Sequence, residues 1–241
     1  DESPKTRHQR MSTIRQFALF MNTLDFNFYV FPENEFVRKM NDFVPYVFTH
    51  EEISNIWLIT DNMKYASNSK YAHLIYPMLL RMLYGCGLRI NEALSLKITD
   101  INLDNGVITV NKAKSNVTRF IPMSETLTLY CRHYVKEMAF DISLEGYFYP
   151  APDGRKYNSG SILTGFRSIL RKAKIITTES SNPRIHDLRH TFAVHSLEKM
   201  VSQGQDIYCA LPILQTYMGH QDVESTEQYL RLTSDTYGII I

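Results

Sequence analysis

The sequence contains little cysteine, and its three cysteines, Cys86, Cys131 and Cys209, lie far apart. An odd number of widely spaced cysteines does not form a disulfide framework, so we expect a reducing compartment. Long apolar runs are lacking as well. The most apolar stretch, YAHLIYPMLLRMLYGCGL, is interrupted by Pro77 and Arg81 and is too short between charges to cross a bilayer. The N-terminus also lacks the apolar core of a signal peptide. These absences predict a cytoplasmic protein that has no membrane partner.

Motifs for nucleotide cofactors and metals are missing too. GCGLRI lacks the third glycine of a dinucleotide fingerprint and precedes no strand-helix-strand unit, and the chain has no Walker-type phosphate loop. HDLRH, residues 186–190, has the histidine spacing of a zinc protease helix. However, Asp187 stands where that mechanism needs a glutamate base, and Arg189 would place a fixed positive charge beside the metal. The sequence therefore predicts neither a cofactor nor a metal.

Charge of one sign is not in excess, because the net charge is +1 over 241 residues. Its distribution is uneven: residues 155–174 carry six basic side chains and no acidic one, whereas acidic residues dominate after position 220. Such a run is typical either of a basic binding face or of plain solvated surface. An apolar content of 44% suffices for one large domain, alone or with a small appendage.

Hydrophobic periodicity places the start of the main domain near residue 46. Residues 11–22 have helical spacing and predict a short leading helix, followed by a linker that includes Pro32. Thr49 then provides an N-cap, with Glu52 three residues later in the pattern of a capping box. The chain also opens on Asp1 without an initiator methionine, which predicts a piece of a longer protein.

The main domain is predicted to be mainly helical with a small antiparallel sheet. Helical periodicity continues over 71–84, and Gly85 and Gly87 are predicted to stop it before a further helix in RINEALSLKI. GVITVNKAK and TRFIPM alternate as strands do, and LDNG precedes the first of them, which predicts a hairpin or a small meander. From residue 124 onward the pattern is helical again, apart from the turn-rich YPAPDGRKYNSG.

Two arginines and a histidine are candidates for binding one anion. His186 and Arg189 are three residues apart, so they share a helical face and can hold a phosphate together. Arg89 follows a glycine stop and could supply a second guanidinium, with Glu92 three residues later to orient it. Taken alone, a pair such as His186 and Arg189 is more often a structural cluster, and a plain surface salt bridge explains Arg89 and Glu92 nearly as well.

Four segments, in this order and spacing, resemble the signature boxes of the tyrosine recombinases, or phage-type integrases. They are GLRINEALSLKITDI, NKAKSNVTRFIPM, HDLRHTFAVHSLEKM and LQTYMGHQDVESTEQYL, and the resemblance covers roughly residues 46–235. Residues 11–22 are similar to the last helix of the family's helical core-binding domain. The resemblance implies that residues 1–45 are the end of that domain plus a linker. It implies that residues 46–241 form the catalytic domain, which has the fold of the DNA breaking-rejoining enzymes.

The resemblance also implies a set of catalytic residues. Carried over position by position, these are Arg89, Lys114, His186, Arg189, His220 and Tyr229. Lys112 remains an alternative to Lys114, although counting back from Pro122 at the end of the second strand favours Lys114. Glu92 would orient Arg89 without touching the substrate.

In this family the tyrosine attacks a DNA phosphodiester and forms a 3′-phosphotyrosine, and the released 5′-hydroxyl later attacks a partner strand. No ATP or metal is needed, because the covalent intermediate conserves the bond energy. A phenol with a pKa near 10 is largely protonated at neutral pH, so it needs surrounding positive charge and hydrogen-bond donors. The arginines would clamp the phosphate oxygens, the histidines would add hydrogen bonds or move the tyrosine proton, and the lysine would protonate the leaving 5′-oxygen.

The implied partner is double-stranded DNA. The resemblance implies a homotetramer on two duplexes, a monomer when no DNA is bound, and DNA-bending accessory proteins. A nucleoid-associated integrase of a mobile element fits best. Basic residues proposed to contact the DNA backbone are Lys112, Arg119, Arg155, Lys156, Arg171 and Lys172. The terminal SDTYGIII could be the segment that such proteins pass to a neighbouring subunit, or a tail packed on its own chain.

Two alternatives remain open. A type IB topoisomerase shares the tyrosine chemistry and would relax DNA without exchanging partners. A non-catalytic helix-turn-helix module would use LPILQTYMGHQDVESTEQYL, with Gly219 in the turn. Its recognition helix would carry Glu224 and Glu227, which face DNA phosphates unfavourably.

Overall fold

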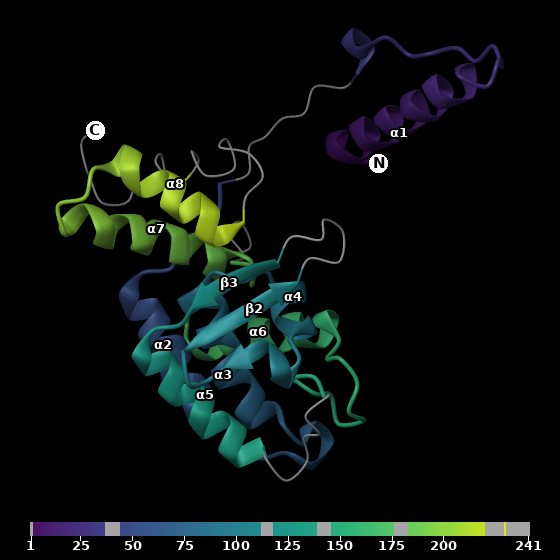
Figure 1. Ribbon diagram of the computed structural model, residues 1–241. Helices are drawn as coiled ribbons and strands as arrows, with labels where there is room; N and C mark the ends of the chain where they lie inside the picture. The colour runs from purple at the N-terminus through teal and green to yellow at the C-terminus, as the bar shows by residue number, and fades with distance from the viewer. Residues whose placement is uncertain are drawn as a thin grey trace. The chain divides into compact units, whose positions relative to one another are not determined.

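The computed structural model describes residues 2–36, 44–111, 118–138, 146–175 and 183–219, together with Tyr229. The chain divides into two compact units, Asp1–Val44 and Pro45–Ile241, each of which has its own internal contacts (Figure 1). Within the described ranges, none of the helices is both long and apolar enough to span a bilayer.

The first unit consists of helix α1 (Pro4–Asn22), a turn and the short 3-10 helix η1 (Glu33–Glu35). The helix starts earlier than the predicted residue 11, because Ser3 caps it by accepting from the Thr6 amide at 3.2 Å and Pro4 occupies the first turn. Several of its apolar side chains are exposed, among them Phe17 at 54% and Phe20 at 58%. Its assignment to a core-binding domain stays a prediction.

The second unit is mainly helical, as predicted. Its α-helices are α2 (His50–Asp61), α3 (Ala72–Cys86), α4 (Ile90–Ser95), α5 (Glu125–Met138), α6 (Ser159–Lys172), α7 (Asp187–Ser202) and α8 (Ile207–Met218). Two 3-10 helices, η2 (Ser67–Ser69) and η3 (Ile98–Asp100), lie in its connections. The sheet contains strands β1 (Ile101–Asn102), β2 (Val107–Asn111) and β3 (Thr118–Pro122), antiparallel in that order. This confirms the predicted fold class.

Local sequence signals account for the boundaries next to the site. The predicted capping box at Thr49 is present and starts α2. Helix α3 passes through Gly85 and ends at Cys86, slightly later than predicted, so Gly87 alone is the stop. Gly87 has φ +58°, and a Cβ on it would lie 2.4 Å from a ring carbon of Phe192. Only glycine combines this left-handed conformation with so close an approach of α7.

The sheet register determines which hairpin side chains face the protein. Ile108 pairs with Ile121 and Val110 pairs with Arg119 across β2 and β3. Ile108, Val110 and Ile121 are buried. Phe120, which precedes Ile121 on β3 and faces the other side of the sheet, is 70% exposed. Because paired residues share a face of a sheet, Arg119 lies on the buried side of the hairpin.

Two hydrophobic clusters form the interior of the second unit. The larger gathers side chains of α2 to α6 and the sheet, and the smaller lies between α7 and α8, which run side by side (Figure 1). Tyr229 belongs to the smaller cluster and is 1% exposed. The Tyr217 hydroxyl of α8 donates to the Pro122 carbonyl at 3.0 Å, so α8 is also tied to β3.

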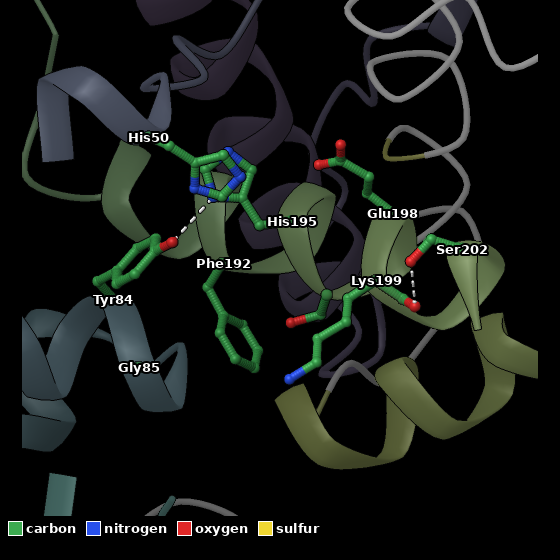
Figure 2. Close-up of a pocket in the computed structure, with 9 residues that line it drawn as sticks. His50, Tyr84, Gly85, Phe192, His195, Glu198, Lys199 and Ser202 are labelled. Atoms are coloured by element: carbon green, nitrogen blue, oxygen red, sulfur yellow. Dashed lines mark hydrogen bonds between the residues drawn. The ribbon is translucent and has the colours of Figure 1, made fainter. Parts of the chain in front are cut away.

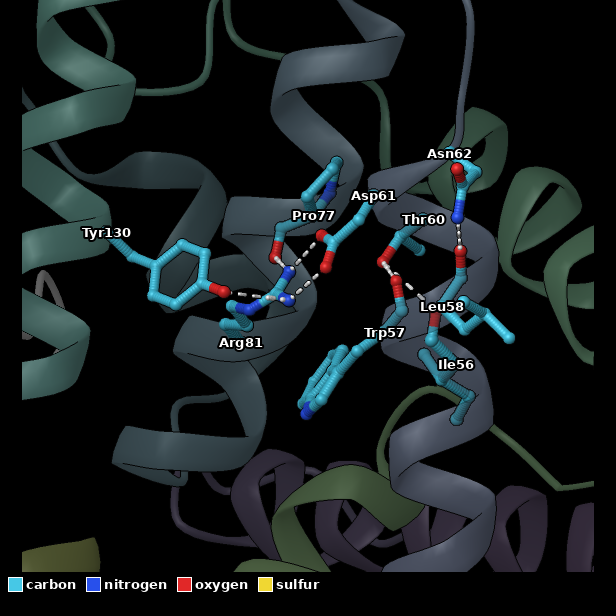
Figure 3. A network of polar contacts seen from close by, with 9 residues as sticks. All are labelled: Ile56, Trp57, Leu58, Thr60, Asp61, Asn62, Pro77, Arg81 and Tyr130. Carbon is cyan, nitrogen blue, oxygen red and sulfur yellow. Dashed lines mark hydrogen bonds and ion pairs between the residues drawn. The ribbon is translucent and has the colours of Figure 1, made fainter.

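A buried arginine joins α2, α3 and α5. Arg81 donates from its two terminal nitrogens to both carboxylate oxygens of Asp61, at 2.8 and 2.7 Å (Figure 3). Its guanidinium also lies over the rings of Trp57 and Tyr130, at 4.8 and 4.3 Å from their centroids. Arg81 is 7% exposed, so its charge depends on these partners.

Asp61→Ala is therefore expected to destabilise the domain, because it leaves the Arg81 charge buried without its carboxylate. Removing one partner of a buried pair costs about 3–5 kcal/mol, and the partial exposure of Asp61 reduces our expectation to about 1–3 kcal/mol. Denaturant unfolding would measure the loss, with Glu137→Ala on the exposed side of α5 as the control. Equal stability of both variants would contradict a structural role for the pair.

Candidate active site

Arg89 and Glu92 form the first part of the candidate site, at the start of α4. Arg89 is the N-cap residue, and Glu92 accepts from its backbone amide at 3.0 Å and from its guanidinium at 2.9 Å. One carboxylate thus fixes both the backbone and the side chain of the arginine. The predicted contact between these residues is present, and 38% of the Arg89 side chain remains exposed and can reach a ligand.

Glu92 has a second basic partner, which the sequence did not indicate. Arg119 donates to its two carboxylate oxygens at 3.3 and 2.8 Å. Burial raises the pKa of the Glu92 carboxyl, but the hydrogen bonds from Arg119 and from the Arg89 amide outweigh it and hold the pKa at about 2. Glu92 is therefore ionised at neutral pH and neutralises one of the two guanidinium charges.

Arg189 projects from the first turn of α7 into the interior and is 1% exposed. It donates to the Gly87 carbonyl and, at 2.8 Å, to the Met218 carbonyl. These bonds join the ends of α3 and α8 at one guanidinium and use two of its five N–H donors. Burial, and then the charge of Arg89, lower the Arg189 pKa to about 10, so it stays charged at neutral pH.

His186 immediately precedes α7 and is half-buried. Burial, followed by the positive charges of Arg189, Arg89 and Arg184, lowers its pKa to about 4. Its imidazole is therefore neutral at pH 7 in the DNA-free protein, and it can either accept or donate a hydrogen bond. A bound anion would oppose the arginine charges and raise this pKa.

Tyr229, near the end of its sequence box, lies against α7. Its hydroxyl lies 3.1 Å from Nδ1 of His190, and the two ring centroids are 5.7 Å apart. His190 in turn packs edge-on against His186, with centroids 5.0 Å apart. Tyr229 also lies close enough to Arg189 for the charge of an ionised phenol to raise the pKa of the arginine. The structure thus adds His190, whose only sequence signal was its place as the second histidine of HDLRH.

The predicted residues fall into three groups. Arg89 and Glu92 lie close enough to His186 and Arg189 to affect the pKa values of both, and Tyr229 lies close enough to affect the pKa of Arg189. Lys112, Lys114 and His220 lie outside the described residues, as do Glu224, Glu227 and SDTYGIII. The remaining residues are the proposed DNA contacts Arg119, Arg155, Lys156, Arg171 and Lys172.

Four of the five residues proposed to contact DNA are exposed, and the fifth is not. Arg171 and Lys172 lie in the last turn of α6, on the surface. Arg155 pairs with Asp153 at 3.4 Å, and Lys156 donates to the Ser95 hydroxyl at 2.6 Å. Arg119 differs, because only 11% of its side chain is exposed and it pairs with Glu92.

A separate pocket of about 430 Å³ lies beside α7 and includes His50, His195 and Glu198 (Figure 2). Their potential ligand atoms lie within 4.8 Å of one another, and the described histidines of HDLRH belong to no such group. His195 is hydrogen-bonded through Nδ1 to the Tyr84 hydroxyl at 2.9 Å and stacks on His50, with centroids 4.1 Å apart. These contacts link α2, α3 and α7.

The fold is that of solved tyrosine recombinases, and known sequences agree with this likeness. The profile of the phage integrase family matches residues 47–235, so the chain belongs to that family. It is a tyrosine recombinase, which confirms the enzyme class predicted from the boxes.

Among its relatives is the putative integrase/recombinase y4rB of Sinorhizobium fredii, which is 29% identical over 227 residues, or 92% of this chain and 72% of the relative. Tyrosine recombinase XerA of Pyrococcus horikoshii is 28% identical, over 81% of this chain and 60% of its own length.

Solved structures share the fold. A crystal structure of XerA recombinase has a TM-score of 0.62 at 20% identity and covers 99% of this chain and 78% of its own. The Tn1549 transposon integrase, solved in complex with transposon right end DNA, has a TM-score of 0.68 at 18% identity, with 98% and 80% covered. These relatives and structures do not favour the topoisomerase or helix-turn-helix alternatives.

Proposed function

We propose that this protein is a site-specific recombinase that cleaves and rejoins DNA through a phosphotyrosine at Tyr229. The observation that carries the proposal is the position of the Tyr229 hydroxyl, which lies against α7 within electrostatic reach of Arg189. Arg189 is itself coupled to Arg89 and His186. Arg189 thus links the phenol to a group of two guanidiniums and a neutral imidazole, and such a group suits a nucleophile that must attack a phosphate anion.

The reaction has two balanced steps. The Tyr229 oxygen attacks the phosphorus of a DNA phosphodiester and forms a bond to the 3′-phosphate, while the bond to the 5′-oxygen breaks. The tyrosine proton leaves to a base, and the 5′-oxygen takes a proton from a general acid. In the second step a 5′-hydroxyl of a partner strand attacks the same phosphorus and gives its proton to a base, while the bond to the Tyr229 oxygen breaks and that oxygen takes up a proton. The phosphodiester count is unchanged, so no ATP is required.

The side chains have distinct roles in this scheme. Arg89 and Arg189 contact the non-bridging oxygens and stabilise the charge of the transition state. His186, neutral because its pKa is about 4, can accept the phenol proton or donate to the phosphate. His220 adds a donor, and Lys114 acts as the general acid, with Lys112 as the alternative.

The DNA partner and the biological setting belong to the same proposal. Exposed basic residues on and before α6, including Arg155, Lys156, Arg171 and Lys172, can neutralise backbone phosphates. The similar Tn1549 enzyme is a transposon integrase in complex with transposon DNA. We therefore place this protein with the integrases of mobile elements, acting as a tetramer on two duplexes with DNA-bending partners.

Covalent capture tests the proposal with no target sequence chosen in advance. The protein is incubated with a pool of nicked duplexes that have a randomised central segment, and adducts that survive denaturation are recovered and sequenced. A recombinase yields adducts with one consensus, and two labelled duplexes with that consensus then exchange strands. Binding without an adduct would overturn the proposal, and supercoil relaxation without strand exchange would indicate a topoisomerase.

The two hairpin lysines predict different results. Lys114→Ala is expected to slow cleavage by about 100- to 10,000-fold, the usual contribution of a general acid, whereas Lys112→Ala slows it by less than about tenfold. Duplexes with a 5′-bridging sulfur, a leaving group that needs no proton, should restore cleavage by Lys114→Ala. The reverse ranking would assign the acid to Lys112.

A further inference from the structure

We propose that Arg119 is a positioning residue of the active site and makes no contact with the DNA backbone. It binds Glu92. Through Glu92 it fixes the position of Arg89 and limits how much of the positive charge of Arg89 is neutralised. This inference rests on the proposed function. It assigns Arg119 a role different from the phosphate contact expected from its place on a basic hairpin.

The contacts of Arg119 point into the protein. Its two terminal nitrogens donate to Glu92 at 3.3 and 2.8 Å, and the same carboxylate accepts from the Arg89 side chain at 2.9 Å. Glu92 is therefore shared between two guanidinium groups. Only 11% of the Arg119 side chain is exposed, against 38% for Arg89. Of the two arginines on this carboxylate, Arg89 is thus the one that can reach a ligand.

Arg119 also packs against Gly219, the C-cap residue of α8. A Cβ added to Gly219 would lie 2.6 Å from a terminal nitrogen of Arg119, so the guanidinium fills the space that any other residue would need. Gly219 ends α8 with φ +66°, a conformation that also favours glycine. One side chain from β3 therefore contacts both the carboxylate that holds Arg89 and the backbone at the end of α8.

The consequence for catalysis follows from charge. With Arg119 in place, Glu92 is balanced by two guanidinium groups, and Arg89 keeps positive charge available to a phosphate. Without Arg119, Glu92 pairs with Arg89 alone, so the positive charge and orientation of Arg89 at the phosphate are both reduced. Because the interaction with the transition state is affected more than contacts along the backbone, cleavage should slow while DNA affinity changes little.

The test compares Arg119→Gln, which keeps hydrogen bonding but loses the charge, with Arg119→Lys, which keeps the charge but loses the fork. We expect Arg119→Gln to cleave about 10- to 100-fold more slowly, the usual cost of misplacing a catalytic group, and Arg119→Lys to recover part of that rate. The dissociation constant for DNA and its salt dependence should match the wild type.

Lys172→Ala is the matched control, since Lys172 is an exposed residue proposed to contact a phosphate. It should reduce the salt slope by about one unit and weaken binding. A double-mutant cycle with Glu92→Gln should show that the two losses are not additive. Thermal unfolding of each variant shows which rates refer to folded protein.

The outcomes separate the inference from the proposed function. If wild-type protein forms no adduct, the proposed function fails. If wild type forms adducts and Arg119→Gln cleaves at the wild-type rate, or lowers the salt slope as Lys172→Ala does, Arg119 is not a positioning residue. Full additivity with Glu92→Gln would also overturn the inference.

Discussion

Tyr229→Phe is expected to abolish the covalent protein–DNA adduct, lowering cleavage by at least about 10⁴-fold, because the variant lacks the phenol oxygen that is the proposed nucleophile. DNA binding should stay within about twofold, since the tyrosine is 1% exposed and contributes little surface to a ligand. Loss of the hydroxyl also removes the 3.1 Å contact with His190, at a cost of about 1 kcal/mol in stability.

Tyr217→Phe is the control for that experiment. Tyr217 lies on α8, and its hydroxyl donates to the Pro122 carbonyl at 3.0 Å, so this variant also loses a phenol that forms a hydrogen bond. It should form adducts at close to the wild-type rate. Adducts on Tyr229→Phe with wild-type yield would show that another residue is the nucleophile.

Arg189→Lys is expected to slow cleavage by about 100- to 1000-fold, the typical cost of removing one preorganised donor from a developing oxyanion. Lysine keeps the positive charge. It cannot donate to the carbonyls of Gly87 and Met218 and also form two parallel hydrogen bonds to a phosphate. Because Arg189 joins the ends of α3 and α8, stability should fall as well, so single-turnover rates must be measured on folded protein.

Arg81→Lys is the comparison for Arg189→Lys, since both replace a buried arginine. Arg81 bonds Asp61, which lies outside the four boxes, and its loss should reduce stability while folded protein keeps the wild-type cleavage rate. If both variants lose cleavage in proportion to stability alone, Arg189 is structural and the phosphate clamp must be reassigned.

Much of this site could be predicted from the sequence because its signals are local. The capping box at Thr49, the glycine stop before Arg89 and the pairing of Arg89 with Glu92 each depend on residues within a few positions of one another. The small sheet followed from strand alternation and turn residues. The box resemblance then supplied the order of the segments and the recombinase family.

Two features could not be predicted, because they depend on long-range contacts. Arg119 is part of a basic hairpin in sequence, but the register of β2 and β3 turns it inward, where it meets Glu92 from α4. The role of His190 depends on its contact with the hydroxyl of Tyr229, which lies 39 positions later in the chain. The start of α1 was missed for a simpler reason: the capping signal of Ser3 and Pro4 precedes the apolar periodicity.

The central claim is that one phosphate is attacked by the Tyr229 hydroxyl within the pocket formed by Arg89, His186 and Arg189. The most direct test is to digest the trapped adduct with protease and nuclease and to identify the linked amino acid and nucleotide by mass spectrometry. The account predicts a 3′-phosphoryl link to Tyr229. A link to any other residue, or a 5′-phosphoryl link to Tyr229, would contradict it.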